Sequence, residues 1–193
     1  MSKKRTAAVV AAGLTVGLLV GPVQGALAGH TNALLDAQLN GRNEVAPNGS
    51  KRIAGDPNGR GEAYVFGIDN ANVGGATPEN NTDTICYVIE VAKISGLENN
   101  PGAPYAAHIH EGQPGENGPV VVNLAFPTGG EAADCISEDR IGPNGSLLFV
   151  RDAMGNQLTT AQEILAHPED YYVNVHNAEF PNGAVRGQLR GDH

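Results

Sequence analysis

The chain has 193 residues, enough for one domain and hardly enough for two. It contains 26 Gly and 12 Pro but no Trp, a composition that disfavours a helical bundle and favours short strands joined by many turns. With 12 Lys and Arg against 21 Asp and Glu, the net charge is -9, which argues against a protein that binds nucleic acid through its phosphates.

The first 28 residues have the three-part layout of a secretory signal peptide. Basic residues at positions 3 to 5 precede an apolar run from Ala7 to Val20, and the small-residue pattern Ala26-Leu27-Ala28 follows. The apolar run is shorter than the roughly 20 residues that a membrane-spanning helix needs. We therefore expect cleavage after Ala28 and no membrane span in the mature chain.

The mature part, residues 29–193, is expected to be a single secreted or extracytoplasmic domain. Because the leader carries three positive charges and no negative ones, its removal changes the net charge from -9 to -12. The chain has two cysteines, Cys86 and Cys135. In an oxidising compartment they are expected to form one disulfide, and two separate buried thiols are the alternative.

Alternating apolar and polar residues recur along the mature chain between Gly, Pro, Asn and Asp residues. This pattern predicts short strands and an all-β, antiparallel sandwich or barrel. The eight expected strands are Ala33–Leu39, Glu62–Ile68, Thr84–Val91, Tyr105–His110, Val120–Leu124, Leu147–Val150, Tyr171–His176 and Ala184–Leu189.

One short helix is also predicted. Thr160 and Glu163 have the spacing of a capping box, Ile164 and Leu165 follow, and Pro168 ends the helix. Long segments rich in Gly, Asn, Pro and acidic residues are expected to be surface loops. These segments are Asn40–Gly61, Asn70–Asp83 and Thr128–Gly145.

Three histidines stand out as candidate metal ligands. His108 and His110 are separated by one residue, so on a strand they share one face while Ile109 points to the other. If the strand that ends at His176 lies beside them, three imidazoles surround a common point, and such a donor set favours copper or zinc. The alternative is that these are half-exposed histidines that hold loops through hydrogen bonds.

Five segments resemble the CHRD domain, which is named after chordin and also occurs singly in secreted microbial proteins. The resemblance spans nearly the whole mature chain and implies an immunoglobulin-like antiparallel β-barrel, but no settled activity. The segments are Leu39–Pro47, His108–Gly112, Gly115–Leu124, Tyr172–His176 and Pro181–Leu189.

The same resemblance implies a distant similarity to copper-zinc superoxide dismutases, with their Greek-key fold. His108, His110 and His176 would then occupy three copper-ligand positions, and Arg186 resembles the arginine that guides the anion. A zinc site and the bridging imidazole are in doubt, because His167 is the only histidine between His110 and His176.

Arg186 has a second interpretation, in which it braces the barrel by pairing with a carboxylate or with loop carbonyls. Glu111 is expected to face away from the histidines, with an outer-shell role as the alternative. The segment Asp56–Glu62 favours a simple turn over a calcium loop, because Arg60 stands where an oxygen ligand is needed.

The sequence thus predicts a binding or interaction module that acts with an extracellular or cell-envelope partner and holds a copper or zinc ion. A copper-dependent, dismutase-like oxidoreductase is the enzymatic alternative. A structural cell-surface or matrix protein without a metal site is the third.

Overall fold

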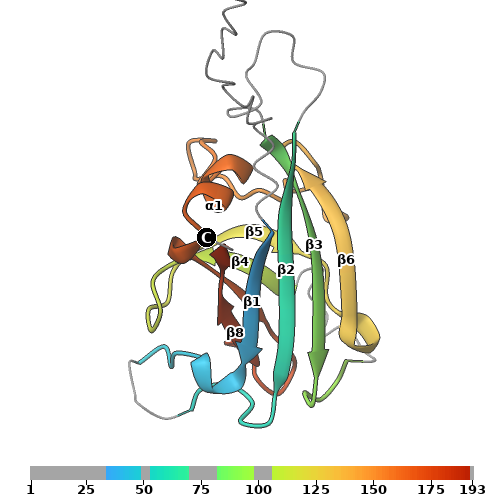
Figure 1. Ribbon diagram of the computed structural model, residues 1–193, viewed down its shortest axis with the longest axis vertical. Helices are drawn as coiled ribbons and strands as arrows, with labels where there is room; N and C mark the ends of the chain where they lie inside the picture. The colour runs from blue at the N-terminus through green and yellow to red at the C-terminus, as the bar shows by residue number, and fades with distance from the viewer. Residues whose placement is uncertain (1–33, 49–52, 70–81, 98–105, 192–193) are drawn as a thin grey trace, which may run out of the picture.

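Antiparallel strands dominate the computed structural model, which describes residues 34–48, 53–69, 82–97 and 106–191. Nine strands form one sheet in the order β5-β4-β7-β8-β1-β2-β3-β6, and β9 pairs with β1 (Figure 1). The strands are β1 Leu35–Asn40, β2 Arg60–Asp69, β3 Thr82–Ala92, β4 Ala107–Glu111, β5 Val120–Leu124, β6 Glu131–Ser137, β7 Tyr171–Val175, β8 Val185–Gln188 and β9 Arg190–Gly191.

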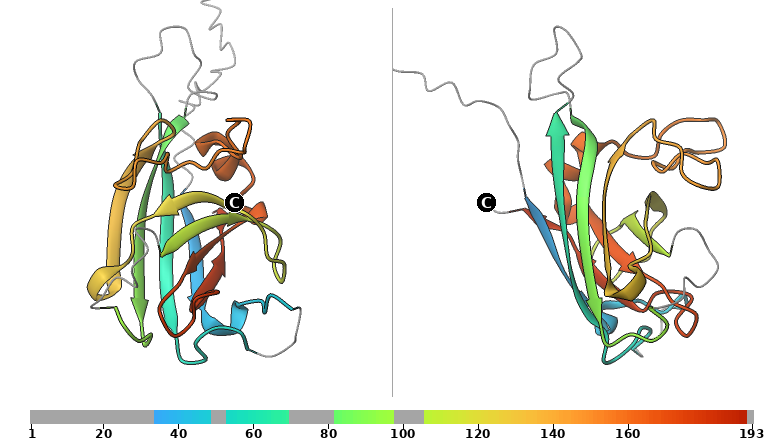
Figure 2. Two further views of the ribbon diagram at one scale, coloured as in Figure 1. Left: turned by 180° about the vertical axis from the view of Figure 1, so that it is seen from behind. Right: turned by 90° about the vertical axis from the view of Figure 1, so that its right-hand side faces the viewer.

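The sheet curls, so that β4 and β5 lie across the long strands β2 and β3, behind them in Figure 1 and in front of them in the left view of Figure 2. Apolar side chains from both parts meet in one core, because each strand turns its alternate residues inward. Ile89 of β3, Ile109 of β4 and Val173 of β7 are all fully buried there. The expected all-β, antiparallel fold with one short helix is therefore confirmed.

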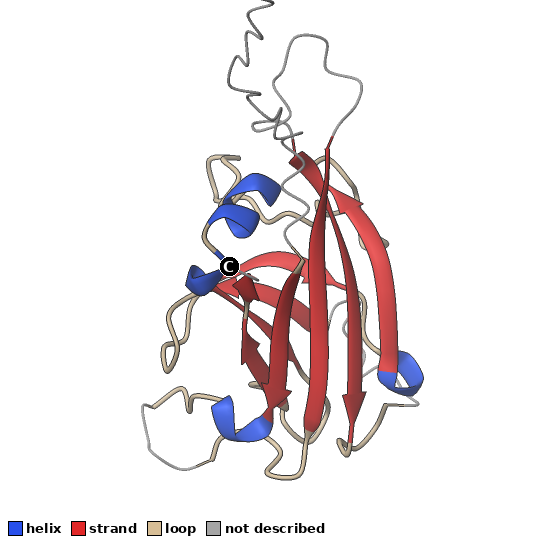
Figure 3. Cartoon of the chain, in the orientation of Figure 1, coloured by secondary structure: helices blue, strands red, loops and turns tan. Residues whose placement is uncertain are grey.

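Helices are few and short (Figure 3). The helix α1 begins after the N-cap Thr160, whose side chain accepts a hydrogen bond from the backbone N–H of Glu163, so the predicted helix start is confirmed. The described residues contain no helix with the length and apolar character of a membrane span. The helical segments are η1 Gly41–Asn43, η3 Thr128–Gly130, α1 Ala161–Ala166 and η4 Pro168–Asp170.

One expected loop contains a strand. Thr128–Gly145 was expected to be a surface loop, and this expectation is wrong because β6 lies within it and pairs with β3 along seven residues. Ala132 and Ile136 are buried, which gives the strand an apolar face despite its low content of β-branched residues. Of the other two expected loops, Asn40–Gly61 contains η1, and Asn70–Asp83 lies mostly outside the described residues.

One expected strand does not form a continuous ladder of hydrogen bonds. Leu147–Val150 was expected to be a strand, but it runs beside β5 with a single bridge, between Phe149 and Val122. Leu148 and Phe149 are both buried although they are neighbours in sequence, so the segment does not alternate as a strand does. Every other expected strand is observed, with ends shifted by a few residues.

The two cysteines form a disulfide across the sheet, as expected. Cys86 of β3 lies directly opposite Cys135 of β6, with a Cα–Cα distance of 4.0 Å. The expected signal peptide, residues 1–28, lies outside the described residues.

Candidate metal centre

The strand β4 separates an apolar face from a histidine face. Ile109 is fully buried in the core. His108 and His110 point to the opposite face, as the period of two predicts, and His110 is 9% exposed. A register shift between Ile109 and His110 interrupts the pairing with β5 at this point. Such irregularities are common where a sheet aims a side chain at a site.

The strand β7 brings the third histidine to the same face. His108 lies opposite Asn174, and His110 lies opposite Tyr172. His176 follows β7 directly, and its backbone N–H donates to the carbonyl of Ala106. This register places His176 diagonally from His108, within reach of a side-chain contact.

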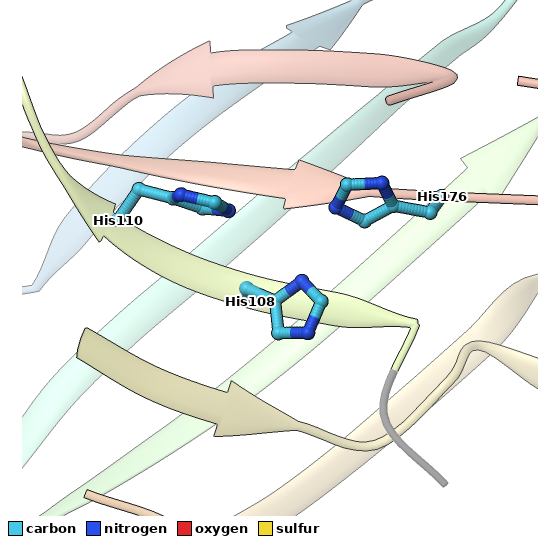
Figure 4. Close-up of side chains that lie close together, drawn as sticks. All are labelled: His108, His110 and His176. Atoms are coloured by element: carbon cyan, nitrogen blue, oxygen red, sulfur yellow. The ribbon is translucent and has the colours of Figure 1, made fainter. Parts of the chain in front are cut away.

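The three imidazoles converge (Figure 4). One ligand nitrogen from each of His108, His110 and His176 lies within 4.8 Å of the others. Three points at that separation lie within about 2.8 Å of a common centre, and metal–nitrogen bonds are about 2.0 to 2.1 Å long. Inward movements of less than about 1 Å therefore suffice to bind one ion.

Hydrogen bonds to backbone carbonyls fix the orientation of two of the rings. The Nδ1 atom of His110 lies 3.0 Å from the carbonyl oxygen of Gly118, and that of His176 lies 3.0 Å from the carbonyl oxygen of Pro181. A carbonyl only accepts, so in each neutral ring Nδ1 carries the proton and Nε2 keeps its lone pair. Both Nε2 atoms are buried and have no hydrogen-bond partner among the described residues.

Burial keeps these rings neutral. Desolvation lowers the pKa of His110 to about 4, outweighing its hydrogen bond to Gly118. Desolvation also lowers the pKa of His176. Neutral imidazole is the form that binds a metal, so protons compete weakly for these nitrogens at neutral pH.

Aromatic stacking supports His110 from the side. Its ring is parallel to that of Tyr172, with 4.7 Å between the centroids. The guanidinium carbon of Arg186 lies 3.3 Å from the centroid of the Tyr172 ring. Since β7 lies between β4 and β8, Tyr172 separates His110 from Arg186.

Arg186 also holds the loop between β4 and β5. Its guanidinium donates to the carbonyl oxygens of Glu116 at 2.6 Å and Gln113 at 3.1 Å. In the same loop, the N–H of Gly118 donates to the Tyr172 hydroxyl. Such contacts with loop carbonyls are what we expect if Arg186 braces the barrel. They fix the loop that contains Gly118, whose carbonyl orients His110.

The remaining candidates lie away from the three histidines. His167 is the exposed C-cap of α1, and Glu111 is exposed at the end of β4. The backbone N–H of Asn58 donates to the Asp56 carboxylate, as in a turn that an Asp side chain closes. Within the described residues, no second group of His, Cys, Asp or Glu converges as the three histidines do.

Glu44 is a buried polar residue beside this face that was not singled out from the sequence. It is 6% exposed, and both carboxylate oxygens lie 3.1 Å from the side-chain nitrogen of Asn174. Burial raises its pKa to about 8, against the opposing effects of Arg186 and Asn174. Its only signal in the sequence is its place within Leu39–Pro47, one of the segments that resemble the CHRD domain.

Comparison with known proteins gives one match. The sequence model of the CHRD domain matches residues 35–189. No curated protein and no solved structure matches the chain.

Proposed function

The chain belongs to the CHRD domain family, and we propose that it is an exported binding module in which three histidines hold one copper or zinc ion. The observation that carries the proposal is the convergence of ligand nitrogens from His108, His110 and His176 within 4.8 Å. A three-imidazole donor set without thiolate is typical of copper and zinc.

Two further features support a metal over a purely structural role. The carbonyls of Gly118 and Pro181 orient the rings of His110 and His176, as carbonyls hydrogen-bonded to ligand histidines do in known metal sites. Their buried Nε2 atoms have no partner within the described residues, which costs free energy unless a ligand is bound.

Export is part of the proposal. The disulfide between Cys86 and Cys135 is typical of proteins that fold outside the reducing cytoplasm. The sequence pattern of residues 1–28 is that of a signal peptide. The module is proposed to act with an extracellular or cell-envelope partner.

Metal titration tests the proposal. Isothermal titration with copper(II) and zinc(II), with metal content measured after dialysis, is expected to give one ion per chain. Replacing both His108 and His110 by Ala should abolish this stoichiometric binding, whereas the matched variant His167→Ala should retain it. A wild-type protein that binds neither metal would rule out the metal site.

The dismutase-like alternative needs an additional result. In the structure the guanidinium of Arg186 donates to the loop carbonyls of Glu116 and Gln113 and lies over the ring of Tyr172, so it is engaged in structural contacts and not free to guide an anion. With EDTA present to chelate free copper, the copper-loaded protein is therefore expected to remove superoxide no faster than the double histidine variant treated in the same way. A rate well above that of the double histidine variant would instead favour the oxidoreductase.

A further inference from the structure

A pocket lies beside the candidate metal centre, between η1, the loop that follows β4, and β8. Its volume is about 430 Å³, within the range of pockets that hold small ligands. Arg186 and Glu44 line it, so it borders the same Arg186 that stacks on Tyr172. The other lining residues include Gln38, Arg42, Gln188 and Arg190.

Positive charge gathers in this pocket although the protein is acidic. Arg42, Arg186 and Arg190 all line it, in a chain with 12 Lys and Arg against 21 Asp and Glu. Among the described lining residues, Glu44 is the one acid. Its contacts are directed to the side chain of Asn174, and its raised pKa keeps it largely protonated at neutral pH. The arginines are therefore not neutralised locally.

Two of these arginines have unused hydrogen-bonding capacity. Arg42 and Arg190 are exposed, and in the part of the chain that the structure describes their guanidinium groups make no hydrogen bond or ion pair. Arg186, in contrast, already donates to two loop carbonyls. A guanidinium fork matches a carboxylate or phosphate group, because it can donate two parallel hydrogen bonds.

We propose that this pocket binds a small anion through a carboxylate or phosphate group. The exposed guanidinium groups of Arg42 and Arg190 supply the hydrogen-bond donors, and Gln38 and Gln188 also line the pocket. The site uses none of the three histidines, so it does not depend on the bound metal.

Titration of metal-free, isotopically labelled protein tests the proposal by amide chemical shifts. The probes are succinate, acetate and inorganic phosphate at constant ionic strength, chosen because they chelate metals weakly. We expect saturable shifts near Arg42 and Arg190 with succinate or phosphate, and weaker binding of acetate. Succinate and phosphate distinguish a carboxylate ligand from a phosphate ligand.

Two charge-matched variants separate the pocket from the general effect of charge. The double variant Arg42→Gln/Arg190→Gln is expected to bind the preferred probe roughly tenfold more weakly. The control Arg140→Gln/Arg151→Gln removes the same charge elsewhere and should bind within about twofold of the wild type. Equal weakening in both variants, or no saturable shifts with any probe, would overturn the proposal.

Discussion

The sheet brings together two groups of side chains from different strands, a cysteine pair and three histidines, and only the cysteines are bonded to each other. Cys86 and Cys135 lie directly opposite each other on β3 and β6 and are joined by a covalent bond. The histidines on β4 and just after β7 are staggered instead, because His108 lies opposite Asn174 and His176 lies diagonally from it.

The difference follows from register. A directly opposed pair on an antiparallel sheet is close enough to bond to itself, whereas staggered residues leave a space between their tips. His108, His110 and His176 surround such a space with nitrogens 4.8 Å apart or closer. The disulfide region is therefore complete within the chain, and the histidine region is built to be completed by a ligand.

The largest effect on stability is expected in the disulfide region. The double variant Cys86→Ala/Cys135→Ala opens a loop that spans 49 positions and should lower the free energy of unfolding by about 4 kcal/mol. Urea unfolding measures this loss. The copper affinity of the folded variant should stay within about threefold of the wild type, because the cysteine strands β3 and β6 pair with neither β4 nor β7. A tenfold loss of affinity would show that the two regions are not independent.

The next largest effect is expected for a histidine ligand, whose loss should weaken copper binding strongly but change the stability little. His176→Ala removes one of three ligands and should weaken copper binding about 100-fold, equivalent to about 2.7 kcal/mol. The free energy of unfolding of the metal-free variant should change by less than about 1 kcal/mol, because the lost ring lies on the polar face of the sheet. Chelator competition and urea unfolding measure the two quantities, with His167→Ala as the control. Unchanged copper affinity in His176→Ala would contradict the assignment of this ligand.

Glu44, which lies beside the histidines, is expected to make the stability of the protein depend on pH. Its pKa is about 8 in the folded protein and 4.5 for a freely exposed glutamate, so between these values the folded state holds more protons than the unfolded state. Its contribution to stability is thus present below pH 4.5 and is lost as the pH rises through about 8. Glu44→Gln should remove this loss and be more stable than the wild type at pH 9, by on the order of 2 kcal/mol.

The measurement is urea unfolding from pH 6.5 to 9. Below pH 6.5 the lowered pKa values of His110 and His176 add a dependence of the opposite sign, since their folded state then holds fewer protons than the unfolded state. The exposed Glu111→Gln variant is the control and should follow the wild type. Parallel profiles for Glu44→Gln and the wild type would contradict the proposed burial effect.

The smallest effect is expected for the support of His110. Tyr172→Phe keeps the stacked ring but removes the hydroxyl that accepts a hydrogen bond from Gly118. Copper affinity should fall about fivefold, equivalent to about 1 kcal/mol, because the carbonyl of Gly118 orients His110. Tyr64→Phe, on the distant β2, should leave the affinity unchanged. An unchanged affinity in Tyr172→Phe would show that the Gly118 loop is held by Arg186 alone.

Local patterns were sufficient to predict most strands and the cap of α1, because alternation and capping depend on neighbours in sequence. The sequence predicted that His108, His110 and His176 converge only if β7 lies beside β4, and no local pattern specifies which strands are neighbours. The strand β6 was missed because the residues of Glu131–Ser137 have weak strand preferences. The expected disulfide between Cys86 and Cys135 was a signal for it, since Cys86 lay in an expected strand. The burial of Glu44 depends on packing between distant segments, which no local pattern reveals.

The most direct test of the account is X-ray absorption spectroscopy of the protein loaded with one equivalent of copper(II). Three imidazole nitrogens at about 2.0 Å are predicted, and fewer in the His108→Ala/His110→Ala variant. The control His167→Ala, at the exposed C-cap of α1, should reproduce the wild-type spectrum. A wild-type spectrum with fewer than two imidazoles, or one unchanged by the double variant, would contradict a metal centre built from these three histidines.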